Sequence, residues 1–230
     1  MFDDVQVISR GSNVADIQNK VLRNTYALLG LSMVPTIIGA FLGLQMNFSF
    51  MAQHPFMFAI GFFVLMFGMF QLIASNQNSS VGVWLLLAMT FVFGLLLGPI
   101  LQVALHLQNG AEIVGLAAAG TGITFLSLAG IASSPARDFS GLGKFLFIGL
   151  ILVLVASLAN MFFHLDPAHL MISGISVLIF SGYILYDVNQ IVRGGQTNYV
   201  MATLAIYLDI YNLFVNLLSI LMSLMGNDRD

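Results

Sequence analysis

The chain of 230 residues has no cysteine, which excludes disulfides, thiol chemistry and cysteine-based metal sites. Its four histidines are scattered and lack the close spacing of a zinc site. The net charge is only −3 and there is no basic patch, so nucleic acid is not an expected partner. The first 20 residues are polar, which argues against a cleavable signal peptide. The histidines are His54, His106, His164 and His169.

Charge is also scarce, because only 7% of the residues are charged, against about 25% in soluble domains. The chain is 59% hydrophobic and its mean hydropathy is +0.96, so the expected solvent is lipid. A membrane-spanning helix needs about 20 apolar residues, and seven stretches qualify. We therefore predict an all-α integral membrane protein, a seven-helix bundle in one domain. The stretches are Val21–Leu44, Phe56–Ala74, Val81–Leu105, Ile113–Ala132, Phe145–Phe163, Leu170–Val192 and Val200–Met225.

Lysine and arginine predict the orientation of these spans. With a cytoplasmic N-terminus, six of the seven basic residues fall on the cytoplasmic side and only Arg229 falls outside. We therefore expect a multi-pass protein of the cell inner (plasma) membrane, with a cytoplasmic N-terminus and an external C-terminus. Residues 1–20 then form a polar cytoplasmic tail, residues 21–225 the seven-helix domain, and residues 226–230 a C-terminal tail. The six are Arg10, Lys20, Arg23, Arg137, Lys144 and Arg193.

Two of the predicted spans carry pairs of glycines four residues apart. Gly39 and Gly43 lie in the first span, and Gly94 and Gly98 lie in the third. Small residues at this spacing let membrane helices approach closely, so we interpret them as sites of close helix packing. Each of these spans also contains a proline, which removes a backbone donor and is able to kink a helix.

Two aspartates, Asp187 and Asp209, lie inside the predicted sixth and seventh spans. A carboxylate in hydrocarbon is costly, so an ionisable residue there is by default a candidate functional residue. Helical spacing places each aspartate in a polar stripe that is expected to face the bundle interior. Both lie about 9–15 Å inside the predicted cytoplasmic boundary, so we expect the two side chains to meet. The stripes consist of Ser173, Ser176, Tyr183, Asp187 and Gln190, and of Asp209, Asn212, Asn216, Ser219 and Ser223.

No lysine or arginine lies at a comparable depth, so neither aspartate has a predicted cationic partner. Desolvation and mutual repulsion disfavour two ionised carboxylates and favour one shared proton. We interpret Asp187 and Asp209 as a pH-sensing gating pair and as transient ligands of calcium, which prefers carboxylate oxygens. The alternative is structural, with neutral aspartates satisfied by polar neighbours. Candidate neighbours are Tyr183, Tyr186, Asn189, Tyr207, Tyr211, Asn212 and Asn216.

Five short segments carry a resemblance to a known family. They are Val21–Tyr26 (VLRNTY), Leu97–Leu101 (LGPIL), Ala159–Phe162 (ANMF), Gly194–Tyr199 (GGQTNY) and Tyr211–Leu221 (YNLFVNLLSIL). From about residue 20 to the C-terminus, the chain resembles the Bax inhibitor-1 (TMBIM) family, and specifically its bacterial YccA-like branch. The turn GGQTNY followed by the final helix is the most specific of these segments.

The resemblance implies a bundle in which the seventh helix is central and wrapped by the other six. It implies a pH-sensitive calcium leak in members with an aspartate pair on helices six and seven, which Asp187 and Asp209 match by motif. Its YccA-like branch implies an alternative function: binding and restraining FtsH, a membrane-anchored AAA+ protease, with a role for the cytosolic tail that Met1–Lys20 would form here. Some leak members have an arginine on helix two near the pair. Here that span has no charge, and Gln71 is its only strongly polar side chain.

A third hypothesis is an intramembrane aspartyl protease, which also uses two aspartates on adjacent spans. Tyr186-Asp187 partly matches the Tyr-Asp motif of these enzymes, but Asp209 lacks their preceding Gly-x-Gly. Serine catalysis is disfavoured because no span pairs a serine with an intramembrane histidine. We therefore expect no enzymatic activity and no cofactor. The expected partners are the lipid bilayer, calcium or another cation, and an FtsH-type membrane protease.

Overall fold

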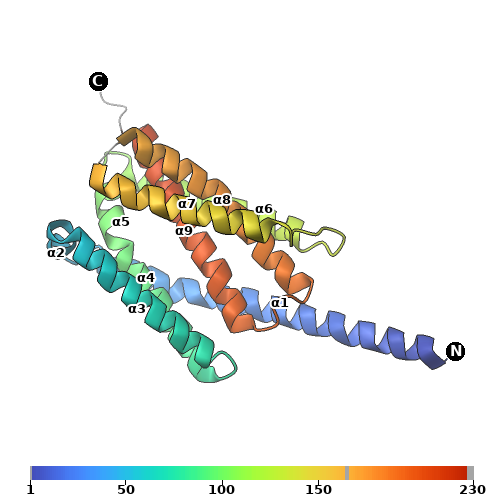
Figure 1. Cartoon of the computed structure of the whole chain (residues 1–230). Coiled ribbons are helices and arrows are strands. Elements are labelled where there is room, and N and C mark those ends of the chain that lie inside the picture. The colour runs from blue at the N-terminus through green and yellow to red at the C-terminus, as the bar shows by residue number, and fades with distance from the viewer. Residues whose placement is uncertain (1, 164–165, 227–230) are drawn as a thin grey trace.

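A computed structural model describes residues 2–163 and 166–226 of the chain (Figure 1). This part of the chain is helical throughout, with short connectors. The helices are α1 (Phe2–Gly43), α2 (Ser49–Gln53), α3 (Pro55–Ser75), α4 (Ser80–Leu96), α5 (Gly98–Leu105), α6 (Gly110–Ala132), α7 (Leu142–Phe163), α8 (Asp166–Val192) and α9 (Tyr199–Met225).

Among the described residues, seven helical segments are long and apolar enough to cross a membrane, and they coincide with the seven predicted stretches. The third span is interrupted, because α4 ends at Leu96 and α5 begins at Gly98. Pro99 lies in the first turn of α5, where a backbone N–H would have no acceptor within the helix. The missing N–H of proline therefore costs no helical hydrogen bond. Pro35, by contrast, lies inside α1, which continues through it.

The distribution of side chains is that of a protein dissolved in lipid. Thr25, Ser32 and Thr90 are completely buried between helices. Trp84 is 71% exposed and Phe67 is 67% exposed. Large apolar side chains therefore cover the outside, and small residues occupy the helix contacts. This is expected in a membrane, because lipid tails are as apolar as a leucine side chain and do not drive such side chains into the interior.

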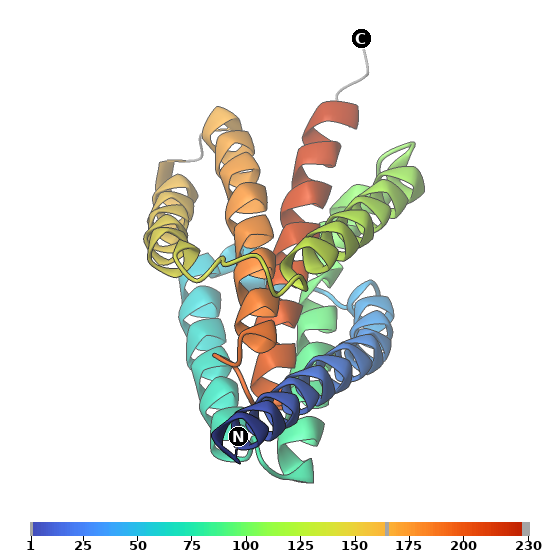
Figure 2. The ribbon, with the colours of Figure 1, turned by 90° about the vertical axis from the view of Figure 1, so that its right-hand side faces the viewer.

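Helix α9 is the central element of the bundle (Figure 1). It contacts α1, α3, α4, α5, α6 and α8 along its length. Helix α7 lies outside this arrangement and packs against α8 (Figure 2). The seventh span is thus central, but α8 separates it from α7, so it is not wrapped equally by all six of the others.

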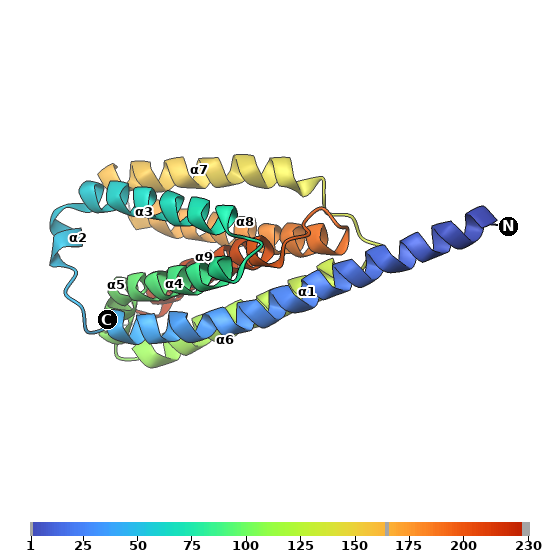
Figure 3. The same cartoon turned by 90° about the horizontal axis from the view of Figure 1, so that it is seen from below.

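The α3–α4, α6–α7 and α8–α9 connectors gather at one end of the bundle, from which the N-terminal half of α1 projects (Figure 3). We call it the basic end because it carries Arg137, Lys144 and Arg193. Helix α1 begins at Phe2, so the segment predicted as a polar tail continues the first span as helix. Residues 227–230, most of the predicted C-terminal tail, lie outside the described residues.

The predicted close packing at the glycine pairs is confirmed. Helix α1 packs closely along the third span, with Gly39 and Gly43 against Gly94 and Gly98. A Cβ atom placed on Gly94 would overlap the carbonyl oxygen of Thr36. Backbone therefore meets backbone at this contact, and only glycine leaves room for it.

Candidate functional site

The two intramembrane aspartates meet where α8 packs against α9. The side chains of Asp187 and Asp209 lie within interaction range of each other. Asp209 is only 5% exposed, and its Oδ2 atom has no hydrogen-bond partner among the described residues. Asp187 is partly buried. The packing of the last two spans thus brings together the two carboxyl groups that the sequence analysis singled out.

A hydrogen bond between two carboxyl groups requires a proton on one of them, because ionised carboxylates only accept. Among the described residues neither aspartate forms a salt bridge, so no cation offsets a second negative charge. No group of three or more histidine, aspartate or glutamate side chains converges in the described part of the chain. The pair offers a calcium ion oxygens from only two side chains, whereas a resident calcium takes 6–8 ligands.

A pocket of about 200 Å³ lies beside Asp187. Its lining runs from Asp187 through Gln190 to Gly195 and Gln196 in the α8–α9 connector. Because that connector is at the basic end (Figure 1), the pocket leads from the aspartate pair toward that end of the bundle. Backbone, amide and carboxyl groups in the lining suit water or a cation.

Two of the predicted neighbours lie beside the pair. The Tyr183 side chain is within electrostatic range of both carboxyl groups. Tyr186 lines the pocket with Asp187, and its ring packs so closely on α7 that a Cβ atom at Gly143 would lie 2.9 Å from it. These two tyrosines are the neighbours that a displacement of Asp187 would disturb first.

The tyrosines of α9 point elsewhere. The Tyr207 hydroxyl lies 2.8 Å from Thr36 Oγ1 and donates to the Thr90 carbonyl oxygen at 3.3 Å. The Tyr211 ring packs edge-on against Phe93, with centroids 4.6 Å apart. Tyr207 and Tyr211 therefore tie α9 to α1 and α4, away from the aspartates.

The asparagines of α9 bond within their own helix. Asn212 Nδ2 donates to the Leu208 carbonyl oxygen, and Asn216 Nδ2 donates to the Asn212 carbonyl oxygen, both at 2.8 Å. Further along the same stripe, Ser219 Oγ lies 2.8 Å from His169 Nε2. Ser223 is exposed, so the polar stripe of α9 ends before it.

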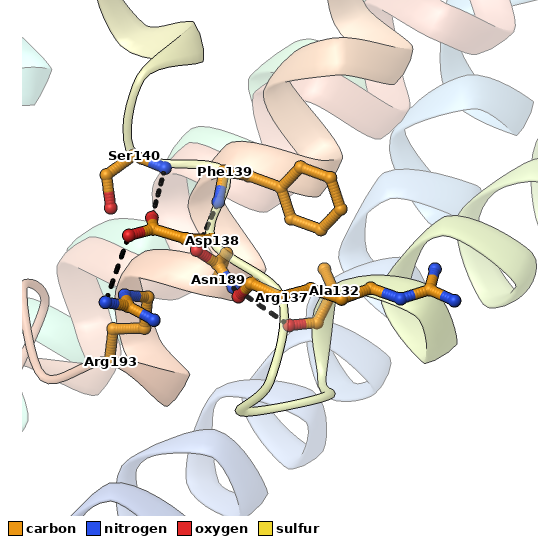
Figure 4. A network of polar contacts seen from close by, with 7 residues as sticks. All are labelled: Ala132, Arg137, Asp138, Phe139, Ser140, Asn189 and Arg193. Atoms are coloured by element: carbon orange, nitrogen blue, oxygen red, sulfur yellow. Dashed lines mark hydrogen bonds and ion pairs between the residues drawn. The ribbon is translucent and has the colours of Figure 1, made fainter.

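Asn189 holds the α6–α7 connector, a role that its helical spacing did not indicate (Figure 4). Its side chain is completely buried. Asn189 Oδ1 accepts the Phe139 N–H at 3.0 Å, and Nδ2 donates to the carbonyl oxygens of Ala132 at 3.3 Å and Arg137 at 3.0 Å. One side chain two residues after Asp187 thus satisfies three backbone groups of the connector.

An exposed ion pair adds a second link between α8 and this connector (Figure 4). Arg193 Nη2 lies 3.0 Å from Asp138 Oδ2. Hydrogen bonds from the Ser140 hydroxyl and N–H, and to a smaller extent the Arg193 charge, hold the pKa of Asp138 below its ordinary value. Because the folded pKa is the lower one, this stabilisation is present at neutral pH and is lost as the pH falls through the folded value. Exposed pairs contribute little, so Asn189 is the main anchor.

Replacing Asn189 with leucine is expected to loosen the α6–α7 connector. Buried backbone groups left without partners cost about 1–3 kcal/mol each, so the open state of the connector should become at least about tenfold more populated. The measurement is the rate of tryptic cleavage after Arg137 in the purified protein. The control is Asn212→Leu, which removes a hydrogen bond to a carbonyl of its own helix and leaves the connector intact. Equal cleavage rates in both variants and the wild type would contradict the anchor role.

The connector that follows Asp187 has local sequence signals that explain its shape. Gly194 has a φ of 77°, a conformation that favours glycine. The Gly195 N–H donates to the Gln190 carbonyl oxygen at 2.8 Å and ends α8. Asn198 caps α9 by accepting the N–H groups of Val200 and Met201. Together they turn the chain sharply, so that Asp187 and Asp209 face one another across a short connector.

Comparison with known proteins gives consistent matches over nearly the whole chain. A family model described as "Inhibitor of apoptosis-promoting Bax1" matches residues 18–227. An "Uncharacterized membrane protein" of Vibrio cholerae is 42% identical over 91% of this chain and 92% of its own length. The "Modulator of FtsH protease YccA" of Escherichia coli K12 is 37% identical over 88% of this chain and 90% of its own length. The "Inner membrane protein YccA" of another Escherichia coli strain matches with the same identity and coverage.

Proposed function

Since the chain belongs to the Bax inhibitor-1 family, we propose that it modulates an FtsH-type protease in the inner membrane. The observation that carries this proposal is the 37% identity to a protein named as a modulator of FtsH protease. That match covers 88% of this chain and 90% of the relative, so it is not confined to one helix. The seven apolar spans place the chain in the same membrane phase as such a protease.

The shape of α1 supports a role in binding a partner. This helix has 42 residues, whereas about 20 are enough to cross the hydrocarbon core. Its N-terminal half projects beyond the basic end, where the other elements form short turns (Figure 3). We infer that the protease binds this chain at the projecting part of α1, on the side that we predict to be cytoplasmic. We call residues 2–15 of α1 the projecting segment.

Deleting residues 2–15 is expected to spare the bundle and weaken this association. The deletion leaves Asp16–Gly43, which is the part of α1 assigned to the membrane. It also leaves Gln18, whose side chain lies against Gly194 in the α8–α9 connector. We expect unchanged membrane insertion, several-fold less protease on co-purification, and slower degradation of the chain by the protease.

A matched control replaces residues 2–15 with a shuffled sequence of the same composition, which keeps the length and charge of the projection. If the protease recognises the sequence of the projecting segment, this control should lower co-purification and degradation as the deletion does. If co-purification and degradation rates in both variants equal those of the wild type, the protease does not bind the projecting segment.

A second function is favoured by the closeness of the Asp187 and Asp209 side chains where α8 packs against α9. We propose that the pair is a proton-linked latch of a cation leak, in which one shared proton holds α8 against α9. Loss of that proton leaves two anions that repel each other and attract a cation. The pocket beside Asp187 supplies a polar approach from the basic end. Calcium is the favoured ion because it prefers carboxylate oxygens.

A further inference from the structure

A large apolar groove lies between α1 and α6. Its volume is about 780 Å³, and α9 contributes its floor with Tyr207, Tyr211 and Phe214. The backbones of α1 and α6 do not approach closely in the described structure, and the Tyr26 and Phe125 rings meet edge-on between them with centroids 6.2 Å apart. The described lining comes from α1, α6 and α9 with Leu97, and no further helix contributes to it. Glycines line both walls, including Gly30 on α1 and Gly122 on α6.

The groove is shorter than a membrane span. Its lining runs along α1 from Tyr26 to Ile37, 11 residue steps or about 17 Å, and along α6 from Ala118 to Ser133, 15 steps or about 23 Å, at 1.5 Å per residue. The hydrocarbon core is about 30 Å thick, so a transmembrane helix of a partner would extend far beyond the groove. An acyl chain from one leaflet matches its depth. Toward the basic end the groove ends at Tyr26 on α1 and at Ser133, which directly follows α6.

Two arginines lie in the chain segments that adjoin this end of the groove. Arg23 lies three residues before Tyr26 and therefore on the same face of α1. Arg137 lies four residues after Ser133, and its side chain extends away from Asp138 and Arg193 (Figure 4). Both arginines are exposed, and neither has a salt-bridge partner among the described residues. Two unpaired arginines beside an apolar groove are complementary to a phosphate attached to an acyl chain.

We infer that the groove between α1 and α6 is a binding site for one anionic phospholipid from the leaflet at the basic end. One acyl chain lies in the groove, and the phosphate lies against Arg23 and Arg137. The bound lipid fills the opening beside α9 and holds α1 and α6 in fixed positions. This site is separate from the aspartate pair and independent of protease modulation.

Photo-crosslinking tests this site on the full-length protein. The purified chain is placed in phosphatidylcholine vesicles that contain a trace of phosphatidylglycerol with a diazirine on one acyl chain. Mapped peptides should show labelling concentrated on residues 26–37 and 118–133, about tenfold above the labelling of lipid-exposed α7. The same photoprobe built on phosphatidylcholine should label these residues several-fold less.

Two variants separate the acyl-chain site from the phosphate site. Gly122→Leu should fill the groove, and because no atom lies within 4 Å of its Cβ position, the fold should tolerate the change. Its labelling should fall about tenfold, while Gly61→Leu, equally free of neighbours but on α3, should label like the wild type. The double variant Arg23→Gln, Arg137→Gln should keep acyl-chain labelling but lose the preference for phosphatidylglycerol. An unchanged melting temperature shows that each variant is folded.

Four results would overturn the inference. Labelling spread evenly over the lipid-facing helices would show that no site exists. Labelling of residues 26–37 that survives Gly122→Leu would place the acyl chain elsewhere. Equal labelling by the two photoprobes in the wild type would show that the site does not select an anionic headgroup. In native membranes, a protein adduct instead of a lipid adduct would assign the groove to a partner.

Discussion

The variant Gly94→Leu is expected to lose more stability than any other single substitution considered for this chain. The Cβ atom would overlap the Thr36 carbonyl oxygen and lie 3.0 Å from the Ala40 N atom. Both obstacles are backbone, so rotation of a side chain cannot relieve them. Overpacking a core costs about 1–3 kcal/mol, and we expect the upper end of that range or more, because α1 and α4 must separate.

The measurement is the melting temperature of the purified protein in detergent. At about 2–4 °C per kcal/mol for a chain of this size, the loss should be about 6–12 °C. The matched control is Gly61→Leu, which adds the same side chain where no atom lies within 4 Å of the new Cβ. A melting temperature for Gly94→Leu equal to that of the control would contradict the close packing of α1 on α4.

Replacing both Asp187 and Asp209 with asparagine is expected to abolish the pH dependence of the proposed cation leak. In the wild type, acid supplies the proton that holds the pair together, so the leak should rise as the pH increases and the proton is lost. Two unit charges 4 Å apart repel by about 4 kcal/mol at an effective dielectric constant of 20, enough to change the population of the open state by about a thousandfold. Asparagine keeps the size of the side chain and removes the charge.

The measurement is calcium entry into vesicles that contain the purified protein and a calcium-sensitive dye, from about pH 6 to about pH 8. Asp138→Asn is the matched control, because it makes the same chemical change at an exposed carboxylate of the α6–α7 connector. The control should retain the wild-type pH profile. Calcium entry that is the same at every pH in the wild type and in the double variant would refute the latch and leave the protease proposal untouched.

Much of the fold could be predicted from the sequence because hydropathy is a local property. The seven predicted spans coincide with the helical segments that are able to cross a membrane. The glycine pairs, such as Gly39 and Gly43, predicted close packing because a missing side chain is a local fact with one physical consequence. The GGQTNY segment likewise predicted a turn, and Gly194 and Asn198 now explain how it ends α8 and begins α9.

Other features could not be predicted, because they depend on partners that are distant in the sequence. Helical spacing shows which face a residue occupies, but not what lies opposite. Asn189 follows Asp187 by two residues, yet its amide binds the α6–α7 connector 50 and more residues away. Tyr207 precedes Asp209 by two residues and points instead to α1 and α4. The sequence does indicate that α7 faces lipid, because its hydropathy of 2.5 is the highest of the seven spans in the described residues, but it does not indicate that α7 packs against α8.

The most direct test of the central claim, protease modulation, is the rate at which an FtsH-type protease degrades a membrane substrate in vesicles containing increasing amounts of this chain. If this chain modulates the protease, degradation should slow as the ratio of chain to protease rises, and its rate should reach a plateau when the protease is saturated. The variant lacking residues 2–15 should reach that plateau only at a several-fold higher ratio. A degradation rate that stays constant up to a large molar excess of the folded, full-length chain would contradict protease modulation by this chain.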